Sequence, residues 1–183
     1  GTEFIYSEGL HAVDAVRKYS NLPLFLDTKF HDIPTTIKKS IYPIIEKCRP
    51  DFISVHASGG PEMIKMAVET AGETKILAVL GLTSYPVPDS HMLIFAKNAK
   101  DMGCYGLICP FSSALLIKNQ FKMPVCVPGI RYNEENKDDH VSSGSPTSRG
   151  ISSIDMVIVG RAITAATDPV AVARRIKNDL VVS

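Results

Sequence analysis

Three charges of alternating sign follow an apolar run early in the chain. The apolar residues 24–26 lead directly into Asp27, and Lys29 and Asp32 come soon after. Side chains two positions apart in a strand point to the same face, so we expect Asp27 and Lys29 to lie together. Charges on a short apolar segment are costly to bury unless they pair. The pattern predicts a lysine held protonated by two carboxylates, with a surface ion-pair cluster at a strand end as the alternative.

Polar residues and glycines also follow the other apolar runs of the chain. A barrel of parallel strands places its functional side chains at the carboxyl ends of those strands. The residues in such positions are Asp27, His56, Thr83, Ser84, Pro128, Gly129, Gly160 and Arg161. Arg161 stands beside a glycine after an apolar run, which is typical of an anion ligand. His56 is interpreted as a hydrogen-bonded structural residue, with a contact to the ligand or the charged network as the alternative.

Short apolar runs alternate with longer segments of helical periodicity. The runs are almost continuously apolar, which is typical of parallel strands buried on both faces. The predicted strands are residues 22–27, 52–56, 76–82, 106–109, 125–127 and 156–159. The predicted helices are residues 10–19, 33–47, 61–71, 90–102, 112–119 and 169–181. Local signals support these boundaries, because Pro61 suits a first helical turn, Asp168 an N-cap and Gly103 a helix end.

This alternation predicts a parallel α/β domain, either a barrel or a doubly wound sheet. The chain has neither the GxGxxG pattern of a dinucleotide fold nor a Walker A motif. We therefore expect a (β/α)₈ TIM barrel, formed by residues 1–183 as a single domain. Only six strands are predicted and the barrel needs eight. Residues 1–4 are accordingly interpreted as the tail of a further strand unit, and the first strand unit is expected to be missing from this chain.

The composition excludes several classes of protein. The 183 residues are 45% hydrophobic, which argues against a disordered chain. Twenty Lys and Arg against nineteen Asp and Glu give a net charge of +1, which argues against a nucleic-acid binder. No apolar run approaches the ~20 residues of a membrane span, and the first residues do not read as a signal peptide. We expect a cytoplasmic protein that binds neither nucleic acid nor membrane.

The four cysteines point to the same compartment. Cys48, Cys104, Cys109 and Cys126 form no Cys-x-x-Cys pair, and no His or Cys pair has the spacing of zinc ligands. We expect small buried thiols in a reducing cytosol, and no metal site.

The charged segment resembles the signature of the orotidine 5′-monophosphate decarboxylase family. That signature is Asp-x-Lys-x-x-Asp within a Lys-Phe-His-Asp-Ile-Pro stretch, here residues 27–34. Four later segments resemble the family in the same order. They are Val-His-Ala-Ser-Gly-Gly at 55–60, Leu-Thr-Ser at 82–84, Val-Pro-Gly-Ile-Arg at 127–131 and Val-Gly-Arg-Ala-Ile at 159–163. The ordered set covers almost the whole chain and is far more specific than any one segment.

The resemblance implies a function as well as a fold. It implies a homodimeric barrel with shared active sites that converts orotidine 5′-monophosphate into uridine 5′-monophosphate and carbon dioxide, without a metal or organic cofactor. By this resemblance, Lys29 donates a proton to C6 of the pyrimidine, and Asp27 lies beside the departing carboxylate. Asp32 and Thr36 are the residues that the family lends to the neighbouring subunit's site.

The resemblance also implies a set of residues that bind the substrate. Ser84 contacts the pyrimidine ring, while Gly160 and Arg161 hold the phosphate. Pro128 and Gly129 begin the loop on the phosphate side. That loop is the polar stretch 131–150, and loops of this length are usually functional or mobile.

One loop residue departs from the family pattern. His140 follows two acidic residues where the family often has a glutamine that reaches the phosphate. We expect the loop to be disordered without ligand and to close over the phosphate, with His140 as a phosphate ligand or, alternatively, as an exposed loop residue.

A second departure leaves two other functions open. The family's first-strand aspartate and second-strand lysine have no counterpart in this chain, which begins at Gly1. One alternative is a magnesium-dependent sugar-phosphate decarboxylase or synthase of the same superfamily. The other is a non-catalytic barrel fragment that binds a nucleotide phosphate. Residues 30–34 and 82–84 favour the pyrimidine enzyme over the magnesium-dependent one.

Overall fold

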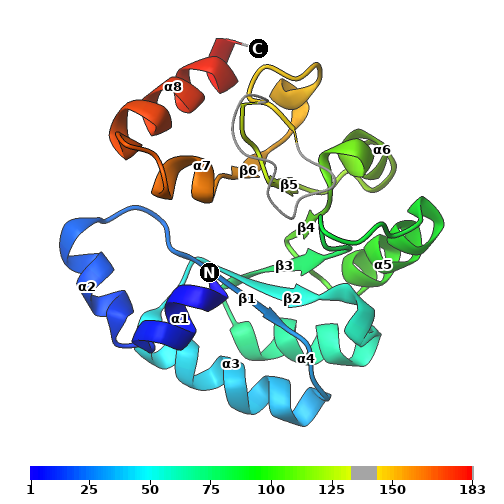
Figure 1. Ribbon diagram of the computed structural model, residues 1–183. Helices are drawn as coiled ribbons and strands as arrows, with labels where there is room; N and C mark the ends of the chain where they lie inside the picture. Colours follow the sequence, from blue (N-terminus) through cyan, green and yellow to red (C-terminus); the bar gives the residue numbers. More distant parts are fainter. Residues whose placement is uncertain (133–143, 183) are drawn as a thin grey trace. The chain divides into compact units, whose positions relative to one another are not determined.

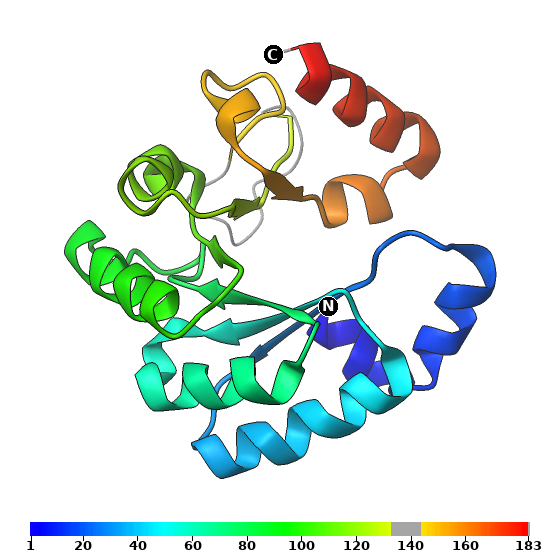
Figure 2. The same cartoon turned by 180° about the vertical axis from the view of Figure 1, so that it is seen from behind.

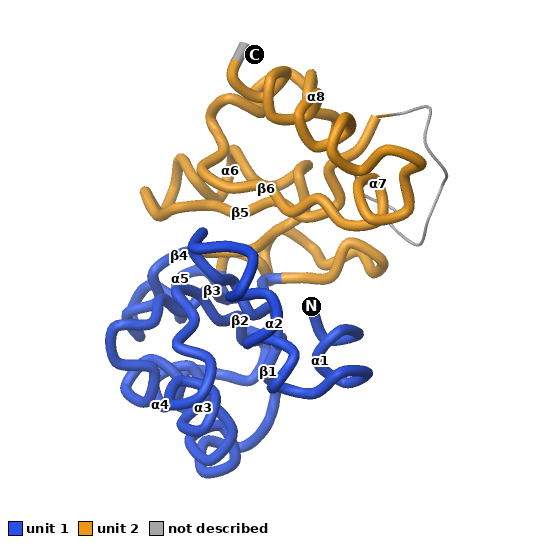
Figure 3. Tube along the Cα trace, turned by 90° about the vertical axis from the view of Figure 1, so that its left-hand side faces the viewer, with its two compact units in different colours: residues 1–80, 94–106 blue, residues 81–93, 107–183 orange. Residues whose placement is uncertain are grey.

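The structure is a computed structural model that describes residues 1–132 and 144–182 (Figure 1). The chain forms two compact units, coloured separately in Figure 3. Unit 1 consists of residues 1–80 and 94–106, and unit 2 of residues 81–93 and 107–183. The assignment of residues 1–183 to one domain stays a prediction.

Unit 1 is built on three parallel strands that pair in chain order. These are β1 (Phe25–Phe30), β2 (Phe52–His56) and β3 (Lys75–Val79). Helix α3 (Pro34–Cys48) follows β1, and α4 (Pro61–Ala71) follows β2 after the short helix η1 (Ala57–Gly59). Figures 1 and 2 show α3 and α4 side by side on one face of these strands. Helix α3 buries Ile37, Ile41, Ile44 and Cys48, a spacing that turns one stripe of the helix to the core.

Two helices precede the first strand of unit 1. They are α1 (Thr2–Glu8) and α2 (Ala12–Tyr19). Residues 1–4, interpreted from the sequence as the tail of a strand unit, are thus helical from Thr2 onward. The predicted helix at 10–19 is confirmed, with its start two residues later.

Unit 2 has the same alternation of strand and helix. Its parallel strands are β4 (Gly106–Ile108), β5 (Val125–Pro128) and β6 (Met156–Ile158), which again pair in chain order. Helix α6 (Phe111–Phe121) links β4 to β5, η2 (Ile151–Ser153) precedes β6, and α8 (Pro169–Val182) ends the chain. Helix α5 (Asp89–Asp101) has residues in both units. The short helix α7 (Arg161–Thr164) was not predicted.

The first strand differs most from its predicted position. It was predicted at 22–27, but it runs from Phe25 to Phe30. Leu22 is 74% exposed, and the pairing with β2 begins only at Phe25 opposite Phe52. The apolar run therefore starts before the strand does, and the strand continues through the polar residues Thr28 and Lys29, which hydropathy alone assigns to a loop.

The predicted local signals and buried thiols are confirmed. Pro61 occupies the start of α4, and the Asp168 carboxylate accepts a hydrogen bond from the Ala171 N–H at 2.9 Å. All four cysteines are free and buried. Burial raises the pKa of Cys104 to about 12. The pKa of Cys109 is also raised to about 12, and burial is the largest cause. In the part of the chain that the structure describes, no helix is both long and apolar enough to cross a membrane.

Candidate active site

A bulge in β1 places the charged residues. Leu26 pairs with Ile53 of β2, and the next paired residue, Phe30, lies opposite Val55. Residues 27–29 of β1 therefore face Ser54 alone on β2, so β1 carries two extra residues at this point. Bulges of this kind bend a strand and redirect its side chains, and they are frequent next to active sites.

The bulge forces Lys29 into an uncommon backbone conformation. Its φ of 48° lies in the left-handed region, which non-glycine residues rarely adopt. Such a conformation costs on the order of 1–3 kcal/mol and persists only where surrounding contacts impose it. Despite the bulge, Asp27 and Lys29 are in contact, while Thr28 and Phe30 line a separate apolar cavity, which is the alternation expected from the sequence.

The expected contact between Asp27 and Lys29 is present. The Lys29 ammonium donates to Oδ2 of Asp27, and the two side chains are 34% and 19% exposed. The other carboxylate oxygen, Oδ1, accepts a hydrogen bond of 2.7 Å from the Ser54 hydroxyl. The Ser54 oxygen in turn accepts the Lys29 N–H at 2.9 Å. Asp27, Lys29 and Ser54 form one connected network, which we call the bulge network.

Two histidines lie next to the bulge network. The rings of His31 and His56 are 5.4 Å apart between centroids. Burial lowers the pKa of His56, and the nearby charges of His31 and Lys29 lower it further, while Asp27 acts in the opposite direction. His56 is therefore neutral at neutral pH, and its interpretation as a hydrogen-bonded structural residue stays a prediction.

The second predicted carboxylate is not part of this network. Asp32 is exposed, and its Oδ1 accepts the N–H of Ile33 at 2.7 Å, just before α3 begins. Among the described residues, the ammonium of Lys29 has its ion pair with Asp27. Within this chain the Asp32 side chain is engaged with its own loop, and the expectation that a second carboxylate holds Lys29 stays a prediction. Thr36 is half-buried in the first turn of α3.

The other predicted site residues belong to unit 2. Ser84 is exposed in a turn closed by the Tyr85 N–H and the Leu82 carbonyl at 3.2 Å. Pro128 is the last residue of β5, and Gly129 follows it with a φ of 76°. Gly160 is the N-cap of α7 and Arg161 its first residue, shortly after the end of β6. Each of these residues therefore stands at or after the carboxyl end of a strand, as a barrel site requires.

The predicted phosphate loop lies partly outside the described residues. At its start, Ile130 forms a β-bridge with Gly144, and the Arg131 N–H donates to the Gly144 carbonyl at 3.0 Å. His140, predicted as a phosphate ligand, lies outside the described residues. Its role and the expected closure of the loop stay predictions.

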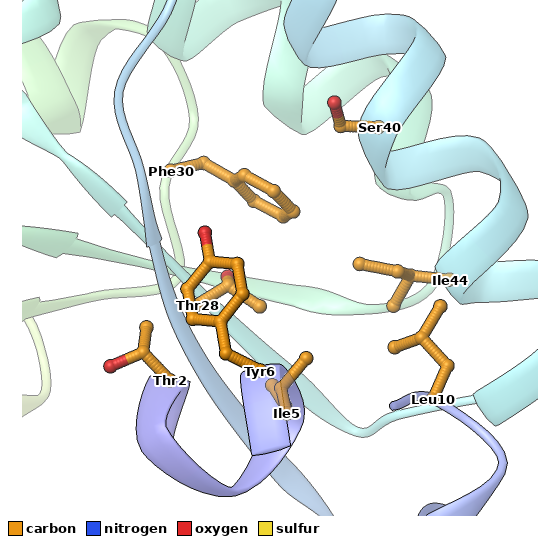
Figure 4. Close-up of a pocket in the computed structure, with 8 residues that line it drawn as sticks. All are labelled: Thr2, Ile5, Tyr6, Leu10, Thr28, Phe30, Ser40 and Ile44. Carbon is orange, nitrogen blue, oxygen red and sulfur yellow. The ribbon is translucent and has the colours of Figure 1, made fainter. Parts of the chain in front are cut away.

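An apolar cavity in unit 1 differs in chemistry from the bulge network. It has a volume of about 200 Å³ and includes Thr28 and Phe30, which alternate with Asp27 and Lys29 along β1 (Figure 4). The remaining lining residues come from α1, α3 and the segment after α1: Thr2, Ile5, Tyr6, Leu10, Ser40 and Ile44. This lining contains no charged side chain, so the cavity does not suit an anionic nucleotide.

Sequence reasoning missed one member of the bulge network. Ser54 is completely buried, yet it is polar and lies within the apolar run Phe52-Ile53-Ser54-Val55. A buried hydroxyl needs a hydrogen-bond partner, and that requirement was the available signal. The sequence could not identify Asp27 and Lys29 as the partners of Ser54, because these contacts depend on a bulge that no sequence pattern predicts.

Comparisons with known proteins agree with the sequence resemblance. The family model described as "Orotidine 5'-phosphate decarboxylase / HUMPS family" matches residues 1–176. The orotidine 5′-phosphate decarboxylase of Ehrlichia canis (strain Jake) is 32% identical over 187 residues, which cover 93% of this chain and 80% of that protein.

Solved structures give the same result for the fold. The crystal structure of orotidine 5′-phosphate decarboxylase from Lactobacillus acidophilus matches with a TM-score of 0.80 and 29% identity, covering 98% of this chain and 84% of that one. The enzyme from Methanocaldococcus jannaschii, crystallised with the inhibitor BMP, matches with a TM-score of 0.77 and 23% identity over 96% and 82% of the two chains. The predicted (β/α) barrel class is thereby confirmed, and the described residues supply six of its strands.

Proposed function

The chain belongs to the orotidine 5′-phosphate decarboxylase / HUMPS family, and we propose that it converts orotidine 5′-monophosphate into uridine 5′-monophosphate and carbon dioxide. This is a step of pyrimidine biosynthesis. The observation that carries the proposal is the pairing of Lys29 with Asp27 on the bulge of β1, within the Asp-x-Lys-x-x-Asp signature. The curated relative is named for this decarboxylation, which favours it over the magnesium-dependent alternative.

Lys29 has two tasks in this reaction. When the bond between C6 and the carboxyl carbon breaks, its electron pair stays on C6 and carbon dioxide leaves. A fixed ammonium beside C6 stabilises the developing negative charge and then transfers its proton to C6. The neutral amine regains a proton from solvent, and the product is uridine 5′-monophosphate. Asp27 accepts a hydrogen bond from the Lys29 ammonium and aims it.

Contacts to the phosphate and the pyrimidine ring supply binding energy that positions the substrate. Arg161 and the backbone near Gly160 bind the phosphate, and Ser84 contacts the pyrimidine. His140 adds a further contact to the phosphate. Binding energy from these contacts holds the reacting ring in place and lowers the barrier of the chemical step.

A second copy of the chain completes each site. Asp32 and Thr36 serve the site of the neighbouring subunit in a homodimer. Two observations support this: Asp32 is exposed and stays apart from Lys29, and its neighbour Ile33 is 66% exposed. An exposed aliphatic side chain beside a functional carboxylate suits a surface that a partner covers. The enzyme works in the cytoplasm, where its four thiols stay reduced.

A turnover assay with a chelator tests this function. The purified protein is mixed with orotidine 5′-monophosphate, and the release of uridine 5′-monophosphate is followed with and without EDTA. We expect turnover that EDTA leaves unchanged, because the proton donor is a side chain. Loss of activity with EDTA and its return with Mg²⁺ would favour the magnesium-dependent alternative. A folded protein without any turnover would favour the non-catalytic one.

A further inference from the structure

A serine is buried in the middle of β2, where the neighbouring residues are apolar. Ser54 is 0% exposed and lies between Ile53 and Val55, which are also 0% exposed. A buried hydroxyl that found no partner would be strongly destabilising. The hydrogen-bond partners of Ser54 therefore indicate why a polar residue occupies this buried position of β2.

Both partners of the Ser54 hydroxyl belong to the proposed chemistry. It donates to Oδ1 of Asp27 at 2.7 Å and accepts the N–H of Lys29 at 2.9 Å. A hydroxyl has one proton to donate and lone pairs to accept with, so one Ser54 oxygen serves both residues at once. Because Oδ1 of Asp27 is held by Ser54, the other oxygen, Oδ2, accepts the hydrogen bond from the Lys29 ammonium.

Ser54 also replaces the strand pairing that the bulge interrupts. It is the single residue of β2 opposite residues 27–29. Its carbonyl accepts the Thr28 hydroxyl at 3.0 Å, and its own hydroxyl receives the Lys29 N–H. The left-handed backbone at Lys29, with φ of 48°, is thus held by a side chain of the neighbouring strand.

We propose that Ser54 is a positioning residue for the decarboxylation, which fixes the Asp27 carboxylate and the Lys29 backbone so that the ammonium is aimed at C6. The inference rests on the proposed function. Ser54 acts only through Asp27 and Lys29, and it takes no proton from the substrate. Its removal therefore affects the chemical step and leaves the binding of ring and phosphate in place.

Steady-state kinetics of Ser54→Ala test this role. Because a displaced reacting group costs about 10²-fold in rate, we expect kcat to fall by roughly that factor. KM and the affinity for uridine 5′-monophosphate should change by less than about threefold, since the binding contacts remain. Ser54→Thr keeps the hydroxyl and suits a strand, so it should retain kcat within about tenfold of the wild type.

A matched control separates positioning from loss of stability. Ser113 is 4% exposed and donates to Oδ1 of Asp89 at 2.8 Å, so Ser113→Ala also removes a hydrogen bond between a buried serine and an aspartate. It should lower Tm as Ser54→Ala does and leave kcat unchanged. Amide hydrogen exchange at Lys29, read by NMR with ¹⁵N-lysine, should accelerate in Ser54→Ala only.

Three outcomes would overturn the inference. If Ser54→Ala kept wild-type kcat while the wild type turned over substrate, Ser54 would have no part in positioning. If Ser113→Ala lowered kcat as much, the effect would be general destabilisation. If the folded wild type itself showed no turnover, the proposed function would fail and this role with it, and that result is distinct from the other two.

Discussion

At the scale of the residue, one ammonium carries the proposed chemistry. Lys29→Ala removes both the charge that stabilises the carbanion and the proton that quenches it. We expect turnover to fall by at least ~10³-fold, several kcal/mol of barrier, with the fold intact. The kcat and the circular dichroism spectrum of the purified variant check both parts.

A surface lysine provides the control for this substitution. Lys97 pairs with Asp101 at 2.5 Å and its side chain is 70% exposed, so Lys97→Ala also removes one lysine of an Asp–Lys pair. It should turn over substrate at the wild-type rate. Near-normal turnover by Lys29→Ala would contradict the role given to Lys29.

His56 makes the stability of the fold depend on pH. Burial, then the charges of His31 and Lys29, lower its pKa below the ordinary value of 6.5. In the unfolded chain the imidazole binds a proton near pH 6.5, whereas in the folded chain it does so only at lower pH. As pH falls from about 6.5 towards the folded pKa, the unfolded state binds more protons and the folded state loses stability.

Substitution of His56 should therefore remove part of this acid destabilisation. We expect the free energy of unfolding of His56→Asn to fall less than that of the wild type between about pH 7 and pH 5. Urea unfolding at several pH values measures the difference. The exposed His91 at the start of α5 supplies the control, His91→Asn. Parallel pH curves for the wild type and His56→Asn would refute the prediction.

At the scale of the element, apolar runs predicted which segments are strands and where most of them lie. All six predicted strands and six helices are present, and β2 matches its predicted residues, because a buried parallel strand needs a continuous apolar run. Helix α4 matches equally well, since Pro61 and Gly72 mark both of its ends.

The same pattern misplaced β1, which is the strand that matters most for the site. Its ladder with β2 continues past the apolar run through Thr28 and Lys29, and it contains a bulge. Hydropathy records which residues are apolar, but a bulge is decided by pairing with another strand. The contact between Asp27 and Lys29 was therefore predicted correctly, whereas the bulge and the role of Ser54 were missed.

In the chain as a whole, the residues that the family resemblance singles out lie far apart in the sequence. Asp27, Lys29 and Ser54 belong to unit 1, whereas Ser84 and Arg161 belong to unit 2. The family match from residue 1 to residue 176 spans both units. The Asp32 side chain contacts its own loop, whereas Lys29 of the same chain pairs with Asp27, so Asp32 is available to a second subunit.

Mixing two inactive variants tests whether sites are shared between subunits. Lys29→Ala and Asp32→Asn should each be impaired alone, because every site in either homodimer lacks one group. In a mixed dimer with shared sites, one site lacks both groups and the other carries Lys29 from one subunit and Asp32 from its partner. Random exchange of a 1:1 mixture makes about half of the dimers mixed, so we expect about a quarter of wild-type turnover to return. Differently tagged subunits confirm the exchange, and two tagged forms of Lys29→Ala mixed together give the baseline. Exchange without recovered turnover would mean that Asp32 serves no neighbouring site.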